Sequence, residues 1–446
     1  MSNRWTPGNA GELATLTAVA LLLLLALVAA AIPWITPGEN ETTRRLAAIA
    51  IFATSYLALA IGKVPGLSID RAGVALVGAC LMVASGVMTL DDAYQAVDMQ
   101  TVTLLLGMMI VVANLRISGF FALVNAWVVC RVHRPVLLLA AIVLVSGAFS
   151  AFLVNDAICL VMAPLVLELT LGLGRNPVPY LLAVAMASNV GSTATITGNP
   201  QNMMIGSFSQ IPYTQFAAAL APVALIGLVL TVALLALLHR ADLRGESLRP
   251  RLPRPRVNRV LVARSLIATA LVVALFFAGQ PPAKAAIVIG ALLLLTRRVK
   301  SARVYAEIDW SLLLMFTGLF IIIAGVEREL LKAQTVEAVG RLHLATVTVL
   351  SLVTAVLSNL VSNVPAVLLL KPFVAALPDH DRAWLVIAMA STLAGNFTVL
   401  GSIANLIVVE KAARRGIAIS FWDYFRVGAP LTLLTLTAGT LWLMWR

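Results

Sequence analysis

The sequence predicts an all-α polytopic membrane protein with about 11 transmembrane helices in two inverted repeats. Three observations carry this prediction. Of the 446 residues, 61% are hydrophobic and 12% are charged, whereas soluble domains average about 45–50% apolar and about 25% charged residues. Apolar stretches long enough to cross a bilayer recur along the whole chain. Three blocks of the first half also recur, in the same order, in the second half.

The elements follow from these apolar stretches, in order. Spans are expected near 12–34, 44–62, 71–88, 100–118, 212–239, 261–279, 282–297, 309–327 and 426–445, with interrupted spans at 178–206 and 382–410. Two longer apolar regions, 135–172 and 344–378, fit neither one span nor two. The chain therefore divides into an extra N-terminal span (1–43), a first repeat (44–239), a basic linker (240–260) and a second repeat (261–446).

Charge sets the orientation. The formal net charge is +12, but the basic residues gather in loops between spans, which is typical of the positive-inside rule and not of nucleic-acid binding. The linker 240–260 and the turns at 297–303 and 411–415 are then cytoplasmic, while Asp91–Asp92 and Asp379–Asp381 lie outside. We expect an inner (cytoplasmic) membrane protein with a cytoplasmic N-terminus and an external C-terminus. Arg44–Arg45 is the one basic pair on the wrong side.

This orientation is self-consistent only if 135–172 and 344–378 each enter and leave on one side. Each is therefore predicted to be a re-entrant hairpin, which requires protein or a water-filled cavity to satisfy its tip. The two hairpins align with an offset of 208 residues, so that Asn155 falls on Asn363 and Pro164 on Pro372.

The interrupted spans align with an offset of 203, and residues 97–113 align with 308–324, which places Gly107 on Gly318. Five spans and one hairpin per repeat invert the second copy relative to the first. Inverted repeats with broken helices are an architecture of secondary transporters, with the site near the midplane.

Polar side chains within apolar segments gather at the two hairpin tips and the two interrupted spans. Gly and Pro break a helix, and Ser, Thr and Asn compete for backbone hydrogen bonds, so a continuous helix would not favour these runs. We expect one substrate or ion site formed by Asn155, Asp156, Ser192, Thr193, Thr195, Thr197, Asn199, Asn202, Ser362, Asn363, Gly395, Asn396, Thr398, Ser402 and Asn405.

Unwound backbone offers carbonyl oxygens to a cation, and half-helix N-termini favour an anion. A sodium ion is therefore predicted at Asn155, Gly198, Asn363 and Gly401. Asp156 is the only acidic residue at either hairpin tip, and a carboxylate at membrane depth indicates a functional role. It would carry a coupling proton, bind sodium, or be a structural carboxylate held by hairpin N–H groups. No other metal and no cofactor is expected, because three scattered Cys and four His at span ends form no ligand set.

The paired motifs resemble the ion transporter superfamily. They are GSTATITGNPQN at 191–202, GNFTVLGSIAN at 395–405, NDA at 155–157 and SNVP at 362–365. The most similar branch is that of the arsenite-pump and NhaD-like permeases, which are related to the divalent anion/sodium symporters. The resemblance implies a homodimer, in which a scaffold part dimerises and a transport part that holds the hairpins moves as an elevator. The dicarboxylate symporters carry Ser-Asn-Thr at both tips, whereas this chain has Val154-Asn155-Asp156 and Ser362-Asn363-Val364.

The expected function is secondary active transport of a small inorganic oxyanion or its hydroxide form, in the manner of arsenite efflux by antiport, driven by H⁺ or Na⁺. The alternatives are a sodium/proton antiporter, a sodium-coupled carboxylate transporter and a passive channel. A membrane enzyme is disfavoured, because its best feature, Asp91–Asp92, has no second acidic motif and indicates a solvated turn.

Overall fold

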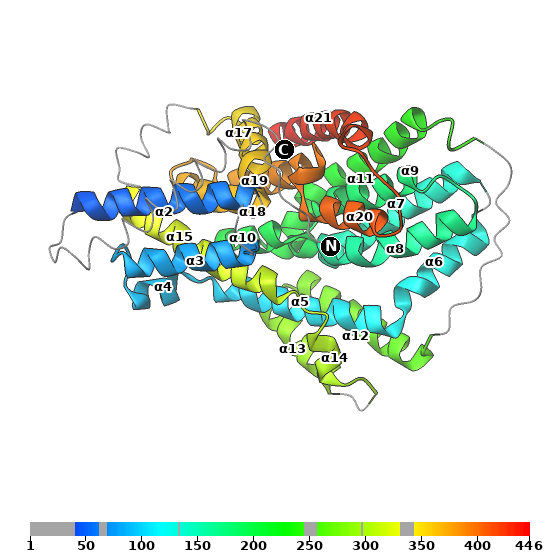
Figure 1. Ribbon diagram of the computed structural model, residues 1–446, viewed down its shortest axis with the longest axis horizontal. Helices are drawn as coiled ribbons and strands as arrows, with labels where there is room; N and C mark the ends of the chain where they lie inside the picture. Colours follow the sequence, from blue (N-terminus) through cyan, green and yellow to red (C-terminus); the bar gives the residue numbers. More distant parts are fainter. Residues whose placement is uncertain (1–40, 62–68, 133, 245–256, 296–297, 331–342) are drawn as a thin grey trace, which may run out of the picture. The chain divides into compact units, whose positions relative to one another are not determined.

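The computed structural model describes residues 41–61, 69–132, 134–244, 257–295, 298–330 and 343–446, and throughout these ranges the regular structure is helical (Figure 1). The prediction of an all-helical membrane protein is therefore confirmed. The expected first span at 12–34 and most of the basic linker lie outside the described residues.

The chain forms two compact units. Unit 1 comprises residues 1–99, 309–342 and 371–376, and unit 2 comprises the remainder. The described helices of unit 1 are α2 (Glu41–Ile61), α3 (Arg71–Ala84), α4 (Leu90–Ala96) and α15 (Trp310–Leu330), together with the end of α18 (Asn363–Val374).

Close packing of α15 on α3 forms the centre of unit 1. A Cβ atom on Gly318 would lie 2.5 Å from the backbone of Ala75, and one on Gly78 would lie 2.4 Å from the hydroxyl of Ser55. Only glycine lets these helices approach so closely, which is a common device in membrane helix packing.

Three consecutive charged residues end α15, and each pairs with a different element of unit 1. Glu327 Oε1 lies 3.9 Å from Lys371 Nζ of α18. Arg328 pairs with Asp92 of α4, and Glu329 Oε1 lies 3.9 Å from Arg44 Nε of α2. These three ion pairs connect the end of α15 to α18, α4 and α2.

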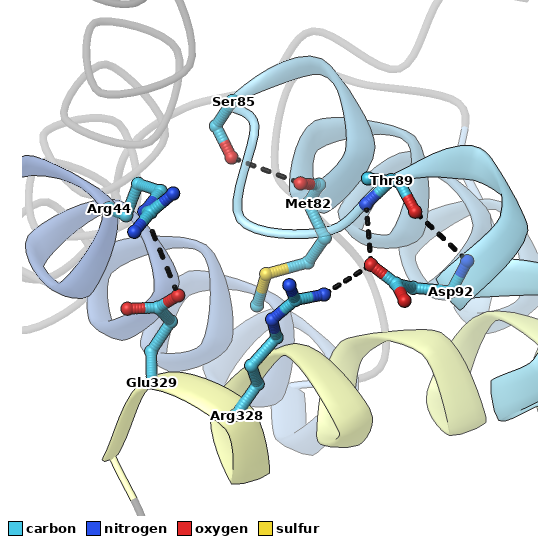
Figure 2. A network of polar contacts seen from close by, with 7 residues as sticks. All are labelled: Arg44, Met82, Ser85, Thr89, Asp92, Arg328 and Glu329. Atoms are coloured by element: carbon cyan, nitrogen blue, oxygen red, sulfur yellow. Dashed lines mark hydrogen bonds and ion pairs between the residues drawn. The ribbon is translucent and has the colours of Figure 1, made fainter. Parts of the chain in front are cut away.

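Figure 2 shows two of these pairs and the capping box in which Asp92 takes part. The side chains of Thr89 and Asp92 each accept a hydrogen bond of 3.1 Å from the other residue's backbone N–H. Hydrogen bonding to Thr89, together with Arg328, holds the pKa of the Asp92 carboxyl below its usual value. The acidic pair of the sequence thus caps a helix, and Arg44, which seemed misplaced, meets a carboxylate.

Unit 2 contains the hairpins and the interrupted spans. Its helices are α5 (Met99–Ser118), α6 (Phe120–Arg131), α7 (Pro135–Phe152), α8 (Asn155–Gly172), α9 (Val178–Ser192), η1 (Ile196–Gly198), α10 (Pro200–Ser209), α11 (Tyr213–Leu238), α12 (Arg259–Phe277), α13 (Pro282–Leu294), α14 (Ser301–Tyr305), α17 (Val347–Val361), the start of α18, α19 (His380–Ala394), η2 (Val399–Gly401), α20 (Ile403–Ala413) and α21 (Phe421–Trp445). Helices α8, α9 and α20 pack side by side (Figure 1).

Each long apolar region is a pair of helices. Residues 135–172 form α7 and α8 and turn at Leu153–Val154, whereas 344–378 contains α17 and α18, which are separated only by Ser362. Ser362 adopts φ +80°, a left-handed conformation that costs a non-glycine residue about 1–3 kcal/mol.

Among the described residues, seven helices are long and apolar enough to cross a membrane, namely α5, α7, α8, α11, α12, α15 and α21. Several expected spans are shorter helices. Helix α9 ends and α10 begins at the first break, and α3, α13, α17 and α18 each have fewer than 18 residues. The hairpin arms α7 and α8 have 18 residues each, or about 27 Å of helix.

The aligned glycines Gly107 and Gly318 make the same contact in different units. A Cβ on Gly107 would lie 2.6 Å from the backbone of Ala286, just as Gly318 meets Ala75. The offset of 211 residues that maps Gly107 onto Gly318 also maps Ala75 onto Ala286. Gly107 therefore contacts the residue that aligns with Ala75, and Gly318 contacts Ala75 itself.

Candidate functional site

The first helix break lies between α9 and α10. It contains Gly198, Asn199 and Pro200, and Asn199 begins α10 by accepting a hydrogen bond from Asn202 N (2.8 Å). The Asn202 amide then turns back and donates to the carbonyl oxygens of Ser192 (3.1 Å) and Thr195 (3.0 Å). An asparagine side chain thus satisfies the carbonyls that the unwound backbone exposes.

The second break, between α19 and α20, is built in the same way. Ser402 begins α20 by accepting from Ala404 N (3.3 Å), and the Asn405 amide donates to the carbonyls of Gly395 (2.7 Å) and Thr398 (3.1 Å). Ser402, Asn405, Gly395 and Thr398 each lie 203 positions beyond their counterparts in the first break. Only the backbone N–H that donates to the capping side chain differs, since it belongs to Asn202 in the first break and to Ala404 in the second. The two breaks are therefore alike in geometry as well as in sequence.

Each hairpin tip contacts the break of its own half. In the first half, Ser150 Oγ donates to Ser188 O (2.6 Å), and Thr195 Oγ1 donates to Ala151 O. In the second half, the residue aligned with Ser150, Ser358, donates through Oγ to Ser391 O (3.0 Å). Polar contacts thus hold each tip against an interrupted helix.

The second tip places the Asn363 amide 2.5 Å from Ser358 Oγ. With its nitrogen turned toward the break, this amide donates to the carbonyls of Ser391 (3.2 Å) and Gly401 (3.3 Å). That orientation satisfies both of its amide atoms and is the one we adopt.

Asn189 joins the two halves into one polar cluster. Its Oδ1 accepts from Asn155 Nδ2 (3.0 Å) and Ser402 Oγ (3.1 Å). Its Nδ2 donates to the Oδ1 atoms of Asn396 and Asn405, both at 2.9 Å. One amide in α9 therefore contacts the first hairpin tip and the second break, which are more than 200 residues apart.

A second group of hydrogen bonds surrounds Thr392 of α19. Its hydroxyl accepts from Asn199 Nδ2 (3.0 Å) and Gln201 Nε2 (3.3 Å) and donates to Asn202 Oδ1 (3.5 Å). Asn199 also donates to Ser192 Oγ (3.1 Å). We call the residues around Asn189 and Thr392 together the amide–hydroxyl cluster.

The cluster is buried and uncharged. Asn189, Asn199, Asn202, Asn396 and Asn405 are each at most 1% exposed. Burying an amide without a partner costs free energy, and the hydrogen bonds described above satisfy most of these groups. The exception is Asn155 Oδ1, which is buried and has no hydrogen-bond partner among the described residues.

Asp156 follows Asn155 in the first turn of α8 and is half-buried. It is the acidic residue nearest to the cluster in the sequence, since it adjoins one of the cluster's members. Cys159, one turn further along α8, lies with its Sγ 2.9 Å from Ser188 Oγ and is fully buried.

Most of the predicted site residues are brought together, although not all contribute side chains. Thr193 and Ser192 donate to Asn189 O, whereas Gly395 and Thr398 contribute backbone carbonyls. Gly198 and Gly401 are tight backbone positions, and a Cβ there would lie 2.1 and 2.8 Å from the carbonyl oxygens of Ser192 and Gly395. Ser362 is half-buried at its tip.

The prediction missed Asn189, Gln201, Ser358, Ser391, Thr392 and Tyr213. Asn189 and Gln201 lie within the polar run at 188–202 and carried the same signal as the residues selected. Thr392 carried little signal, because a lone threonine in an apolar helix usually bonds its own backbone.

Comparison with known proteins identifies the class of protein as a membrane transporter. Residues 56–394 match the CitMHS family, described as citrate transporter. An uncharacterized transporter of Mycobacterium tuberculosis is 31% identical over 89% of this chain and 98% of its own length. The silicon efflux transporter LSI3 of rice (Oryza sativa subsp. japonica) is 27% identical over 87% of this chain and 95% of its own. The crystal structure of the Alcanivorax borkumensis YdaH transporter superposes with a TM-score of 0.60 at 13% identity and covers 90% of this chain and 98% of that one.

Together, the family match and the relatives define a multi-pass membrane transporter. The chain belongs to the CitMHS citrate transporter family. The predicted membership of the ion transporter superfamily is therefore confirmed.

Proposed function

We propose that the protein is a secondary active transporter of a small inorganic oxyanion in its neutral hydroxide form, with the amide–hydroxyl cluster as its binding site. The observation that carries this proposal is the combination of a buried, uncharged cluster with one unsatisfied acceptor, Asn155 Oδ1. An acceptor without a donor favours a ligand that brings its own O–H groups. Arsenous and silicic acids are ligands of that kind near pH 7, and the rice relative is named for silicon efflux.

The uncharged cluster also supports a neutral ligand over an ionised one. An ion transferred from water to a buried site is stable only if a charge or several strong dipoles compensate its lost hydration. Amides and hydroxyls form the cluster, and its hydrogen bonds among the described residues involve no Lys or Arg. A hydroxide ligand needs donors and acceptors only, which these side chains supply.

For the coupling ion we favour a proton carried by Asp156 over sodium. Sodium at the breaks would need the carbonyls of the unwound backbone, but those of Ser192, Thr195, Gly395 and Thr398 already accept from Asn202 and Asn405. Sodium at these carbonyls would compete with the two amides for the same oxygens. Asp156 directly follows Asn155, a member of the cluster, in the first turn of α8.

We further propose two inverted repeats and elevator-type alternating access in a homodimer. The reciprocal contacts of Gly107 and Gly318 support the repeats. The predicted assignment of segments to common sides of the membrane is supported by ion pairs between distant segments, because each pair below joins residues on the same predicted side. Arg44–Glu329 and Arg328–Asp92 are external, whereas Arg116–Glu307 and Arg415–Glu168 are cytoplasmic.

Transport into proteoliposomes tests the binding site. Asn155→Ala and Asn363→Ala should each weaken the apparent affinity for arsenite or silicate about 2- to 13-fold, which corresponds to one hydrogen bond of about 0.5–1.5 kcal/mol. Asn176→Ala, which removes an exposed amide bonded to Asp242, is the matched control and should leave flux unchanged. Wild-type transport by both tip variants would show that these amides do not bind the substrate.

Gradient-driven accumulation tests the coupling. If Asp156 carries the proton, Asp156→Asn should abolish accumulation and leave exchange of substrate for substrate, because only the empty return step needs the proton. If the variant instead loses its dependence on sodium and binds the substrate more weakly at every pH, Asp156 is a sodium ligand. Unchanged accumulation over the accessible pH range, by a folded protein, would remove the carboxylate from the mechanism.

The second candidate is a sodium-coupled carboxylate transporter, which the family's description as citrate transporter favours. Citrate carries several negative charges near pH 7 and would need cationic or strongly dipolar partners. A screen of thermal shifts with citrate, arsenite and silicate, each with and without sodium, separates the two. Stabilisation by citrate only in sodium would replace the first proposal by the second.

A further inference from the structure

A cavity of about 580 Å³ lies in unit 2 beside the first break. Its rim includes Gln210, Gln280 and Lys284, all exposed to solvent. Its floor includes Ile196 and Met203, which are 2% and 0% exposed. The cavity therefore has a polar, open rim and an apolar, buried floor.

The floor of this cavity adjoins the polar residues of the break. Ile196 lies in η1, and Tyr213, which also lines the cavity, has its hydroxyl 2.8 Å from Thr197 Oγ1. Thr197 Oγ1 lies 3.4 Å from Thr195 Oγ1, and Thr195 donates to Ala151 O at the first hairpin tip. A series of hydroxyls thus runs from the cavity to the tip next to Asn155.

The ring of Tyr213 separates the cavity from these hydroxyls. It is 4% exposed, and its centroid lies 5.1 Å from that of Phe276 and 5.2 Å from that of Phe277. These aromatic contacts hold the ring in place, while the hydrogen bond to Thr197 ties it to the break. Because the Tyr213 hydroxyl is bonded to the break, a rearrangement of the break can move the ring.

The charge at the rim is positive. Lys284 is exposed in the first turn of α13 and has no ion pair among the described residues. An uncompensated cation at the mouth of a low-dielectric cavity repels other cations and admits anions and neutral solutes.

We propose that this cavity is the vestibule through which the substrate reaches the amide–hydroxyl cluster, that Lys284 excludes cations from it, and that Tyr213 is its gate. The inference rests on the proposed function and extends it to the route and to the charge of the admitted solutes, which are small oxyanions and their neutral hydroxides. Under the predicted orientation, residues 206–212 and 279–282 are external, so the vestibule opens to the outside.

Cysteine labelling tests the rim charge without any transport measurement. In a background with Cys80→Ser and Cys130→Ser, Ser207→Cys places a thiol in the cavity, and Thr214→Cys places one on the adjacent exposed surface of α11. The ratio of the modification rate by the anionic reagent MTSES to that by the cationic reagent MTSET should be higher for Ser207→Cys than for Thr214→Cys. Adding Lys284→Gln should lower this ratio about two- to fivefold, while Lys284→Arg should keep it. An equal ratio with and without Lys284 would overturn the cation exclusion.

Flux after labelling tests the route. MTSES modification of Ser207→Cys should block arsenite or silicate flux, whereas modification of Thr214→Cys should leave it unchanged. Full flux through labelled Ser207→Cys protein would overturn the vestibule. If the unlabelled protein transports no oxyanion, the proposed function is wrong, and the labelling ratio still decides the charge of the cavity.

The gate is tested by a cysteine behind it, Ser192→Cys. Tyr213→Phe keeps the ring and removes its hydrogen bond to Thr197, and Thr197→Val removes the same bond from the other side. Each should speed MTSES modification of Ser192→Cys about three- to tenfold, in line with one buried hydrogen bond, and the double variant should add nothing further. Unchanged rates in both single variants would exclude Tyr213 as the gate.

Discussion

Among the polar residues that the structure describes, Asn189 should be the most sensitive to substitution. Asn189→Ala removes contacts with four side chains, those of Asn155, Ser402, Asn396 and Asn405. Side-chain hydrogen bonds within membrane proteins average about 0.6 kcal/mol in double-mutant cycles, so four of them contribute about 2.4 kcal/mol. The partners left buried and unpaired add to this loss, because an unsatisfied group costs about 1–3 kcal/mol. We expect a destabilisation of about 3–5 kcal/mol.

The matched control for this prediction is Asn114→Ala. Asn114 is also a buried asparagine in a helix, but its amide donates only to Ile110 O of its own helix (2.9 Å), so its loss should cost about 1 kcal/mol or less. Chemical unfolding in detergent, followed by tryptophan fluorescence, measures both free energies. Equal losses in the two variants, or a loss below 1 kcal/mol for Asn189→Ala with transport intact, would refute the central role of Asn189.

Three further outcomes are expected. Gly318→Ala should lower the free energy of unfolding by about 1–3 kcal/mol, because its Cβ would overlap the backbone of Ala75; thermal unfolding measures this, and a stability equal to wild type would contradict the close α3–α15 packing. Hydrogen bonding and Arg328 lower the pKa of Asp92, so its contribution to stability is present above the unfolded pKa of about 3.9 and is lost as the pH falls through the folded value; the stability difference from Asp92→Asn should vanish in acid, and a difference that grows there would be inconsistent with the pairing. Cysteines at Lys300 and His380 should be labelled from the cytoplasm and from outside, respectively, and the reverse would invert the topology.

The fold was largely predictable because its signals are local. The apolar stretches predicted most of the described helices, but not α4, α6 and α14, which lie between the expected spans. The GNP run at 198–200 predicted the break between α9 and α10, because Gly and Pro oppose a continuous helix. The breaks inside the two hairpins were also expected, from the polar residues Asn155 and Ser362. The number of full spans could not be predicted from hydropathy, because a short helix beside a break and a full span are equally apolar.

The partners within the site were not predictable. The sequence predicted unwound backbone at both breaks, with carbonyls for a cation and helix N-termini for an anion. The side chains of Asn202 and Asn405 donate to those carbonyls in the two breaks, which the sequence did not predict. Whether an asparagine turns toward its own backbone or toward a ligand depends on small rotations that no local pattern encodes.

The sequence by itself determined that this is a helical membrane protein and where its helices break. It also showed which apolar segments carry more polar residues than a continuous helix favours. Only the tertiary structure decided that Asn189 joins the first hairpin tip to the second break, and that Arg44 meets Glu329. The physical reason is one of range. Hydropathy and helix breaking depend on neighbours in the chain, whereas hydrogen bonds and ion pairs between residues 200 or more positions apart depend on which helices pack together and at what register.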